Sequence, residues 1–547
     1  MTFRRRPGAR LLAAFAAGAV LLTGCSSGAA TGDGTGTARE PARRDQQPLP
    51  GGPTRAAPED GSRTPQAGEP EGRPTAPPAD YLSTFALDVD TASYGYARRT
   101  LADGRLPSPD GVRPEEFVNS FAQDYPRPEG DGFSVTLDGA RAAGGGHAGT
   151  VGDMDAAPTG TGGTAAGEGA DGHGWSLMRV GLATRARQDG TARPPAALTF
   201  VVDVSGSMAE PGRLDLVRAS LGMLADQLRG DDSLAVVAFS GTAEVRLPMT
   251  RLEGRRDRVH EVVDGLRPSS STNVEAGVTR GYEVAVEGLR PGATNRVVLL
   301  SDALANTGAT SADALLRRIE GARTQHGITL FGVGVGSEYG DALMERLADR
   351  GDGHTVYVSD REEARRVFVE DLPAQVELRA RDAKAQVAFD PRNVERFRLI
   401  GYDNRRVADE SFRDDGVDGG EVGPGHTVTA LYAVRLRPGA SGHVATATVR
   451  WLDPDDRAPH EESGRIEVRA LDRDLWGAGT PERLQVAAVA AHFASELRGR
   501  DGGWAPLPGA VGLGVLAEHA GRLAAGSRDP EVDGLAEAVR RAHRLIG

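Results

Sequence analysis

Cysteine is almost missing from this chain of 547 residues, which contains only Cys25. A single cysteine cannot form an internal disulfide, so a scaffold held together by disulfides is excluded. Lysine is equally scarce, because Lys384 is the only lysine among 64 basic residues, and the formal net charge is −13. Nucleic-acid binding needs a basic stripe on the surface, so the net charge of −13 argues against a nucleic-acid partner.

Long apolar runs are also lacking, and the one near the amino terminus is short. Four arginines precede an apolar stretch from Leu11 to Leu22, which is too short for an ordinary transmembrane helix. It ends in Leu22-Thr23-Gly24-Cys25, which looks like a bacterial lipobox. We therefore interpret residues 1–25 as a lipoprotein signal peptide and Cys25 as the lipid-bearing residue. No later segment could cross a bilayer, so we expect the remainder to be exported, soluble and lipid-anchored to the cell membrane.

Two further segments are too polar or too rich in glycine to build a core. Residues 26–79 contain ten prolines and no aromatic residue, which predicts a disordered tether with an end-to-end distance of roughly 40 Å. Residues 140–174 contain 12 glycines and show no periodicity, which predicts a flexible insertion. The length of the chain leaves room for about three domains besides these segments.

Between residues 190 and 372, short apolar segments alternate with helical patterns. Strand-like segments rich in β-branched residues lie at 197–204, 233–239, 296–300, 328–335 and 354–358. Apolar residues recur at three- and four-residue steps in 213–228, 255–266, 312–323, 341–348 and 361–372. This alternation predicts an α/β domain with a doubly wound, mostly parallel sheet.

Oxygen-bearing side chains follow two of these predicted strands. Asp203, Ser205 and Ser207 stand on a tight loop at the end of the first strand, and Asp302 follows the strand at 296–300 after Ser301. Thr272 precedes a helix and offers a further hydroxyl. Ligands bind at the carboxyl ends of the strands in open α/β sheets. Carboxylates and hydroxyls suit Mg²⁺, Mn²⁺ or Ca²⁺ rather than zinc, so the sequence predicts a divalent-cation site.

This constellation resembles the metal-ion-dependent adhesion site (MIDAS) of the von Willebrand factor type A (VWA) family, because Asp203-x-Ser205-x-Ser207, Thr272 and Asp302 occur in the family's order. The resemblance implies a Rossmann-like domain at 190–372, with an antiparallel edge strand at 243–249. It implies direct coordination by the two serine hydroxyls, and direct or water-mediated coordination by Asp203, Thr272 and Asp302. It also implies a vacant coordination position, which an acidic side chain of a partner protein fills.

The flanking segments resemble those of a family of bacterial VWA lipoproteins. At the amino-terminal side, within 80–189, the shared motifs are Leu87–Tyr94 and Arg113–Asn119. Helical patterns at 94–102 and 114–121 and a strand-like stretch at 175–184 accompany them. After the VWA segment, the shared motifs are Phe397–Arg405 and Gly425–Tyr432.

The carboxy-terminal third changes character at about residue 475. Residues 373–475 predict a β-sandwich-like domain with strands at 384–389, 397–401, 427–436 and 444–451, separated by turns. Residues 476–547 predict a small helical domain with amphipathic helices at 482–498 and 531–545.

Three functions remain open at this stage. The main prediction is a cell-envelope protein that binds a partner through the metal and is not an enzyme, because no His, Cys or Glu lies within the three metal loops. The alternatives are a metal-dependent hydrolase and a purely structural envelope protein. Asp88-x-Asp90 suggests a phosphatase nucleophile, but Ala92 stands where that motif wants a hydroxyl or β-branched residue, so turn or capping contacts at a strand end are favoured.

The lipobox generates a first prediction. Replacing Cys25 by alanine removes the only thiol that can carry a lipid, so the Cys25→Ala variant should leave the membrane fraction. Fractionation of cells that express the wild type and the variant measures this. A variant that stays as tightly membrane-bound as the wild type would show that the anchor lies elsewhere.

Overall fold

The computed structural model describes residues 79–547, apart from 88–89, 131, 143–173, 187–192, 303–308, 337–343, 345–346, 349–352, 354, 372–377, 418, 455, 500–506 and 508. The signal peptide with Cys25, the tether at 26–79 except its last residue, and nearly all of the insertion at 140–174 lie outside these residues. In the described part of the chain, no helix is both long and apolar enough to cross a membrane.

The α/β segment contains a six-stranded sheet with the strand order β6-β5-β4-β7-β8-β9. Its strands are β4 (Ala196–Asp203), β5 (Ser233–Phe239), β6 (Ala243–Arg251), β7 (Thr294–Ser301), β8 (Thr329–Val335) and β9 (Thr355–Val358). All neighbours pair in parallel except β5 and β6, which are antiparallel. The predicted doubly wound sheet and its antiparallel edge strand are both confirmed.

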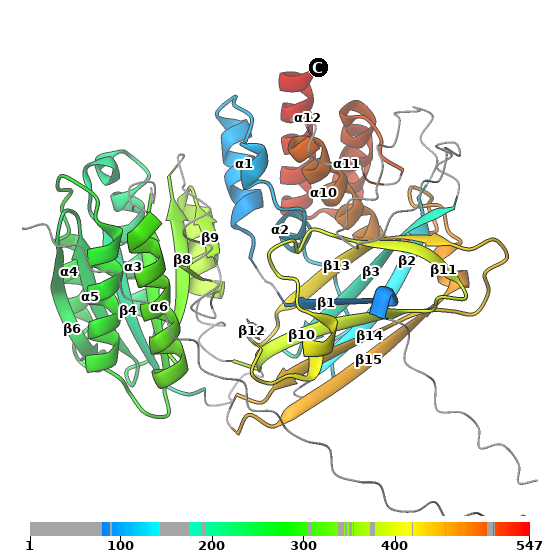
Figure 1. The fold of residues 1–547 in the computed structure, drawn as a ribbon. Coiled ribbons are helices and arrows are strands. Elements are labelled where there is room, and N and C mark those ends of the chain that lie inside the picture. The colour runs from blue at the N-terminus through cyan, green and yellow to red at the C-terminus, as the bar shows by residue number, and fades with distance from the viewer. Residues whose placement is uncertain are drawn as a thin grey trace, which may run out of the picture. The chain divides into compact units, whose positions relative to one another are not determined.

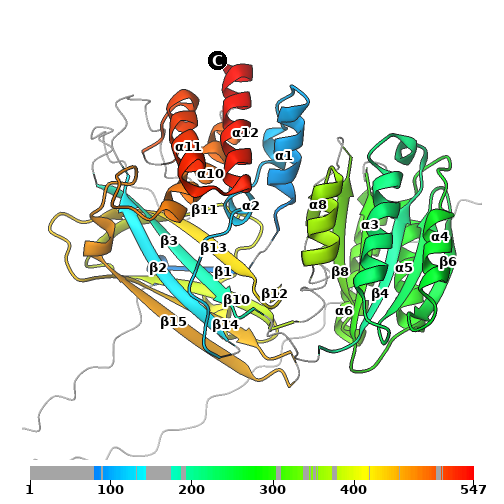
Figure 2. The same ribbon diagram turned by 180° about the vertical axis from the view of Figure 1, so that it is seen from behind.

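Helices cover both faces of this sheet (Figures 1 and 2). One face packs against α3 (Leu214–Gln227), α4 (Arg256–Asp264) and α8 (Arg361–Arg365), and the other against α5 (Val274–Glu287) and α6 (Ala309–His326). Successive side chains of a strand point to opposite faces, and β4 shows this directly. Phe200 and Val202 belong to the first core, whereas Val201 belongs to the second.

Two of the predicted helices in this segment need comment. The predicted helix at 361–372 begins as α8 and continues as a π-helical turn, η4 (Arg366–Asp371). The helix predicted at 341–348 lies mostly outside the described residues.

Helix α5 approaches the sheet unusually closely, and glycine makes this possible. A Cβ on Gly281 would lie 2.2 Å from Val201 Cγ2, and one on Gly277 would lie 2.5 Å from the Phe239 ring. Real Cβ atoms do not approach other atoms so closely, so these positions exclude side chains. The close packing fixes the amino end of α5, where the Thr272 loop enters the helix.

Two antiparallel sheets form a sandwich outside the α/β segment. The first has the order β1-β10-β14-β15, with β12 also paired to β10, and the second has the order β11-β13-β3-β2. Their strands are β1 (Leu82–Ala86), β2 (Phe133–Arg141), β3 (Trp175–Thr184), β10 (Ala380–Phe389), β11 (Val394–Ile400), β12 (Gly420–Val422), β13 (Thr427–Leu436), β14 (His443–Leu452) and β15 (Pro459–Glu467). Apolar residues of both sheets share one core.

The pairings cross the boundary that the sequence suggests between 80–189 and 373–475. Strand β1 pairs with β10, and β3 pairs with β13 along nine residue pairs. The sandwich is thus built from chain on both sides of the α/β segment. Strands β2, β12 and β15 were not predicted, and β15 shows why: it is an exposed edge strand that reads Pro-His-Glu-Glu-Ser-Gly-Arg-Ile-Glu and has no apolar alternation.

Helices from both ends of the described chain pack together (Figures 1 and 2). They are α1 (Ala92–Ala102), α2 (Pro114–Asn119), α10 (Glu482–Arg498), α11 (Leu513–Ser527) and α12 (Pro530–Ile546). Phe117 lies edge-on to Tyr94 and to Phe493, so α1, α2 and α10 share an aromatic core. The helices predicted at 94–102, 114–121, 482–498 and 531–545 are confirmed, whereas α11 was not predicted.

A buried ion pair fixes the amino ends of the central strands. Arg193 Nη1 donates to Asp232 Oδ1 at 2.8 Å, and the same carboxylate accepts from the backbone N–H groups of Ala196 and Arg229. Burial alone raises the pKa of the Asp232 carboxyl, but these hydrogen bonds and the Arg193 charge lower it below the usual value. The ionised carboxylate therefore stabilises the fold above its unfolded pKa of about 4, and that contribution is lost as the pH falls through the lower folded pKa.

We predict that Asp232→Asn destabilises the protein mainly near neutral pH. The midpoint of thermal unfolding should fall by several degrees at pH 7 and by less at pH 3, because pH 3 lies below the unfolded pKa and the contribution of the carboxylate diminishes there. Melting curves of both proteins between pH 3 and 7 test this. An equal fall at both ends of the range would contradict the ionic role of Asp232.

Candidate metal centre

Asp203 lies at the carboxyl end of β4, where the strand meets a tight loop. Its Oδ1 accepts a hydrogen bond from the Ser205 backbone N–H at 2.8 Å, and its Oδ2 accepts one from the Ser301 hydroxyl at 2.6 Å. Ser301 is the last residue of β7, the parallel neighbour of β4. Because the ends of parallel neighbours meet at the same edge of a sheet, two distant loops come together here.

A short row of oxygen atoms extends from this point. Ser205 Oγ lies 3.1 Å from Ser207 Oγ, and Ser207 Oγ donates to Asp302 Oδ1 at 3.0 Å. Ser205 and Asp302 are buried, whereas Ser207 is half-buried at the outer side. The structure thus brings together Asp203, Ser205, Ser207 and Asp302.

The loop that carries Thr272 is held against the first loop by its backbone. The Ser269 N–H donates to the Val204 carbonyl at 2.6 Å, and the Asn273 N–H donates to the Ser240 carbonyl at 2.7 Å. Asn273 also caps α5, because its side chain accepts from the Ala276 N–H. Thr272 is half-buried between these anchors, and its hydroxyl makes no hydrogen bond to any residue that the structure describes.

Burial and like charge work against the ionised form of Asp203. Burial raises the pKa of its carboxyl, hydrogen bonds from Ser301 and Ser205 lower it, and the nearby negative charge of Asp302 raises it again. The net direction is upward. Two carboxylates that share a buried edge are stabilised as anions by a cation placed between them.

The donor set fits a small divalent cation. With Mg–O distances of about 2.0–2.1 Å, adjacent ligands of an octahedron lie about 2.9 Å apart. The observed spacings of 3.1 Å and 3.0 Å along Ser205, Ser207 and Asp302 are close to this value. Within the described residues, no three His, Cys, Asp or Glu side chains gather, so the hydroxyls have to complete the set.

A cationic side chain that the sequence did not single out also reaches this edge. Arg213 precedes α3, and its Nη1 donates to Asp302 Oδ2 at 2.5 Å and to the Ser207 carbonyl at 3.2 Å. Its Nη2 lies 2.7 Å from a carboxylate oxygen of the exposed Glu210. The sequence offers one signal for this contact, which is an arginine directly before the apolar stripe of a helix. Its partner Asp302, however, is 89 residues away in the sequence.

Asp90, for which the sequence favours turn or capping contacts at a strand end, has two partners that are distant in the sequence. Its Oδ1 accepts from the backbone N–H of Thr355, the first residue of β9, at 2.7 Å, and its Oδ2 accepts from Arg405 Nη2 at 3.2 Å. Thr91, not Asp90, is the N-cap residue of α1. Asp90 therefore connects the α/β segment to the loop after β11, and the strand end that its carboxylate contacts is the start of β9. Asp88 lies outside the described residues.

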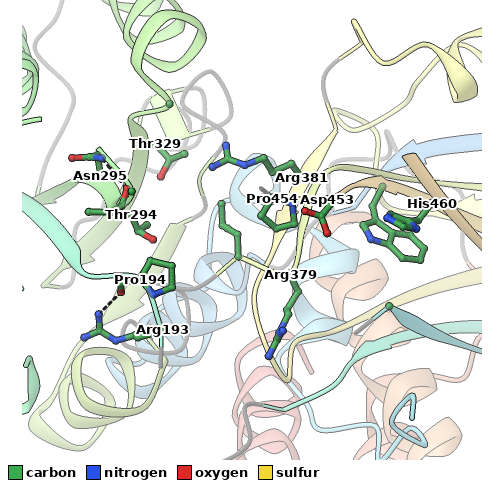
Figure 3. A pocket seen from close by; sticks show the side chains of 16 residues that line it. Arg193, Pro194, Thr294, Asn295, Thr329, Arg379, Arg381, Asp453, Pro454 and His460 are labelled. Atoms are coloured by element: carbon green, nitrogen blue, oxygen red, sulfur yellow. Dashed lines mark hydrogen bonds between the residues drawn. The ribbon is translucent and has the colours of Figure 1, made fainter. Parts of the chain in front are cut away.

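A wider cleft of about 860 Å³ lies near the opposite end of the sheet (Figure 3). Arg193, Thr294 and Thr329, which line it, stand before or at the amino ends of β4, β7 and β8. Arg379 and His460 line it from the sandwich side. A ligand in this cleft would not contact the metal loops, which lie at the carboxyl ends of the same strands.

Three family models match the chain. The model of the von Willebrand factor type A domain matches residues 197–370, and a model described as von Willebrand factor matches residues 71–144. A model of the carboxy-terminal part of the uncharacterized protein YfbK matches residues 376–502. The first match contains all five predicted metal ligands.

Two relatives match the chain in sequence. The chain is 33% identical over 443 residues to "Uncharacterized protein YfbK" of Escherichia coli, an alignment that covers 77% of this chain and 72% of that one. It is 24% identical over 181 residues to "Uncharacterized protein sll0103" of Synechocystis, covering 33% and 41% of the two chains.

Among solved structures, "von Willebrand factor type A from Catenulispora acidiphila" aligns with a TM-score of 0.45 and 16% identity over 74% of this chain and 89% of that chain. The ArnB paralog VWA2 from Sulfolobus acidocaldarius aligns with a TM-score of 0.37 and 14% identity over 76% and 98% of the two chains.

Proposed function

Because the chain belongs to the YfbK family of proteins with a VWA domain, we propose that it binds a partner protein through a divalent cation at the carboxyl edge of the VWA sheet. VWA domains commonly mediate protein–protein interactions. The observation that carries the proposal is the row of Ser205, Ser207 and Asp302 oxygens, spaced 3.1 Å and 3.0 Å apart. The proposed ligands are Asp203, Ser205, Ser207, Thr272 and Asp302.

The two serines and Asp203 have different roles in the proposal. The Ser205 and Ser207 hydroxyls bind directly, because they lie adjacent at the correct spacing. Asp203 is oriented by Ser301 and by the Ser205 N–H, so it supplies negative charge beneath the ion, directly or through water. A bound Mg²⁺ or Mn²⁺ would supply an open coordination position, which takes up a carboxylate of the partner.

The proposal places this domain at the cell envelope. The lipobox at Leu22–Cys25 supports a lipid anchor, and the proline-rich tether at 26–79 supports a domain held away from the membrane surface. The hydrolase alternative needs a general base beside the ion. Glu210 is the nearby candidate, but its carboxylate is ion-paired with Arg213, which supports binding over turnover.

Metal binding is the first test of the proposal. Asp203→Asn keeps the size of the side chain and removes its charge, so the affinity for Mg²⁺ or Mn²⁺ should fall by at least about tenfold. Isothermal titration calorimetry of the purified protein measures the affinity, and circular dichroism should show an unchanged fold. Asp232→Asn is the matched control, since it removes a buried aspartate at the opposite end of the sheet and should leave metal affinity unchanged. Equal affinities of the wild type and Asp203→Asn would contradict the site.

Partner capture is the second test. The Thr272 hydroxyl makes no hydrogen bond within the described structure, so Thr272→Ala should leave the fold intact yet weaken capture several-fold at saturating Mg²⁺. Crosslinking pull-downs from envelope extracts, with and without chelator, measure this, and the same samples can be assayed for hydrolysis. Thr242→Ala is the matched control, because Thr242 is an exposed threonine on the neighbouring β5–β6 turn. Capture that survives both chelator and Thr272→Ala would place the binding surface elsewhere.

A further inference from the structure

We propose that Arg213 is a built-in counter-cation of the metal loops, which holds Asp302 in place while no metal is bound and lowers the affinity of the site for a divalent ion. This inference rests on the proposed metal site and concerns how that site is regulated. It makes Arg213 a positioning residue and not a metal ligand, since a guanidinium has only hydrogen-bond donors.

The two oxygens of Asp302 have different partners. Oδ1 accepts from the Ser207 hydroxyl at 3.0 Å and faces the row of proposed ligands, whereas Oδ2 accepts from Arg213 Nη1 at 2.5 Å. The guanidinium therefore occupies one side of the carboxylate and leaves the other side for a metal. It also donates to the Ser207 carbonyl, so it braces both metal loops at once.

The surroundings allow Arg213 little freedom to move away. Its side chain is only 5% exposed, and Nη2 is held at 2.7 Å from Glu210. The Arg213 side chain passes close to Gly336, the residue directly after β8. Gly336 has a φ of +89°, and a Cβ on it would lie 2.8 Å from Arg213 Nε. A glycine at this position is needed both for the backbone conformation and for the passage of the arginine.

The charges of these groups determine the direction of the effect. Without metal, the guanidinium compensates the buried Asp302 carboxylate, which would otherwise be an unpaired buried charge. With metal bound, the guanidinium and the doubly charged ion lie on opposite sides of the Asp302 carboxylate, and the two positive charges repel each other. Arg213 therefore stabilises the metal-free site and destabilises the metal-bound site. It also keeps the loops in place before the ion binds.

The chain offers a matched pair for testing this idea. Arg213–Asp302 and Arg193–Asp232 are both buried arginine–aspartate pairs with side-chain exposures of 5% and 0%, and they lie at opposite ends of the same sheet. Loss of either arginine leaves a buried carboxylate without its counter-ion and should destabilise the metal-free protein. Only the loss of Arg213 should alter the affinity for metal.

The experiment compares Mg²⁺ affinity and thermal stability of the full chain for the wild type, Arg213→Met, Arg213→Gln, Arg213→Lys and Arg193→Met. The two neutral variants at position 213 should bind Mg²⁺ about tenfold or more tightly than the wild type. Their unfolding midpoints should be lower without Mg²⁺ and rise more than that of the wild type when Mg²⁺ is added. Arg213→Lys keeps the charge and should retain nearly the wild-type affinity, and Arg193→Met should lose stability without a change in affinity.

Several outcomes separate this inference from the proposed function. Neutral variants that bind Mg²⁺ no more tightly than the wild type would overturn the role of Arg213 while leaving the metal site intact. A rise in affinity for Arg213→Lys equal to that of Arg213→Met would also overturn it, because size and not charge would then be responsible. If only the neutral variants bind Mg²⁺, the result would support the counter-cation role of Arg213 and contradict metal binding by the wild type. Absence of binding in every protein would overturn both proposals.

Discussion

The hydrogen bond from the Ser301 hydroxyl to Asp203 Oδ2 joins the ends of two neighbouring parallel strands, and the organisation of the VWA edge depends on it. It is 2.6 Å long and lies between two fully buried residues. The residues that follow each partner, Ser205 and Ser207 on one side and Asp302 on the other, consequently start from a common point. The pairing of the strands thus brings these residues together, and the loop conformations only orient their side chains.

Glycines on α5 extend the same constraint to the third loop. Gly277 and Gly281 let the helix lie against Phe239 and Val201, which belong to β5 and β4. This packing fixes where α5 begins, and therefore where Thr272 enters it. A larger side chain at either glycine would move the helix and the hydroxyl together, although neither glycine touches the proposed ion.

The sequence predicts most of the VWA domain because its signals are local. β-branched strands and apolar helix stripes each lie within one element, and the order of Asp203, Thr272 and Asp302 along the chain carries the resemblance. The sandwich was harder to predict, since β1 pairs with β10 across about 300 residues and its edge strand β15 is covered with charge. The contact of Arg213 with Asp302 was not predicted for the same physical reason. In the sequence Arg213 stands at the start of a helix, and only the folded sheet brings the Asp302 carboxylate near it.

Buried ionic contacts also join the VWA domain to the sandwich strands on either side of it in the sequence. Asp90 binds the first backbone N–H of β9, and Arg296 at the start of β7 is fully buried with its nearest charged partner, Glu421 of β12, at 3.4 Å. Burial lowers the pKa of Arg296 and the Glu421 charge raises it. Removing one member of such a pair leaves the other as an uncompensated buried charge, whereas replacing both with apolar residues does not. The contacts of Asp90 lie on both segments, with the N–H of Thr355 on one side and Arg405 on the other, so the motif around Asp90 connects the VWA domain to the sandwich.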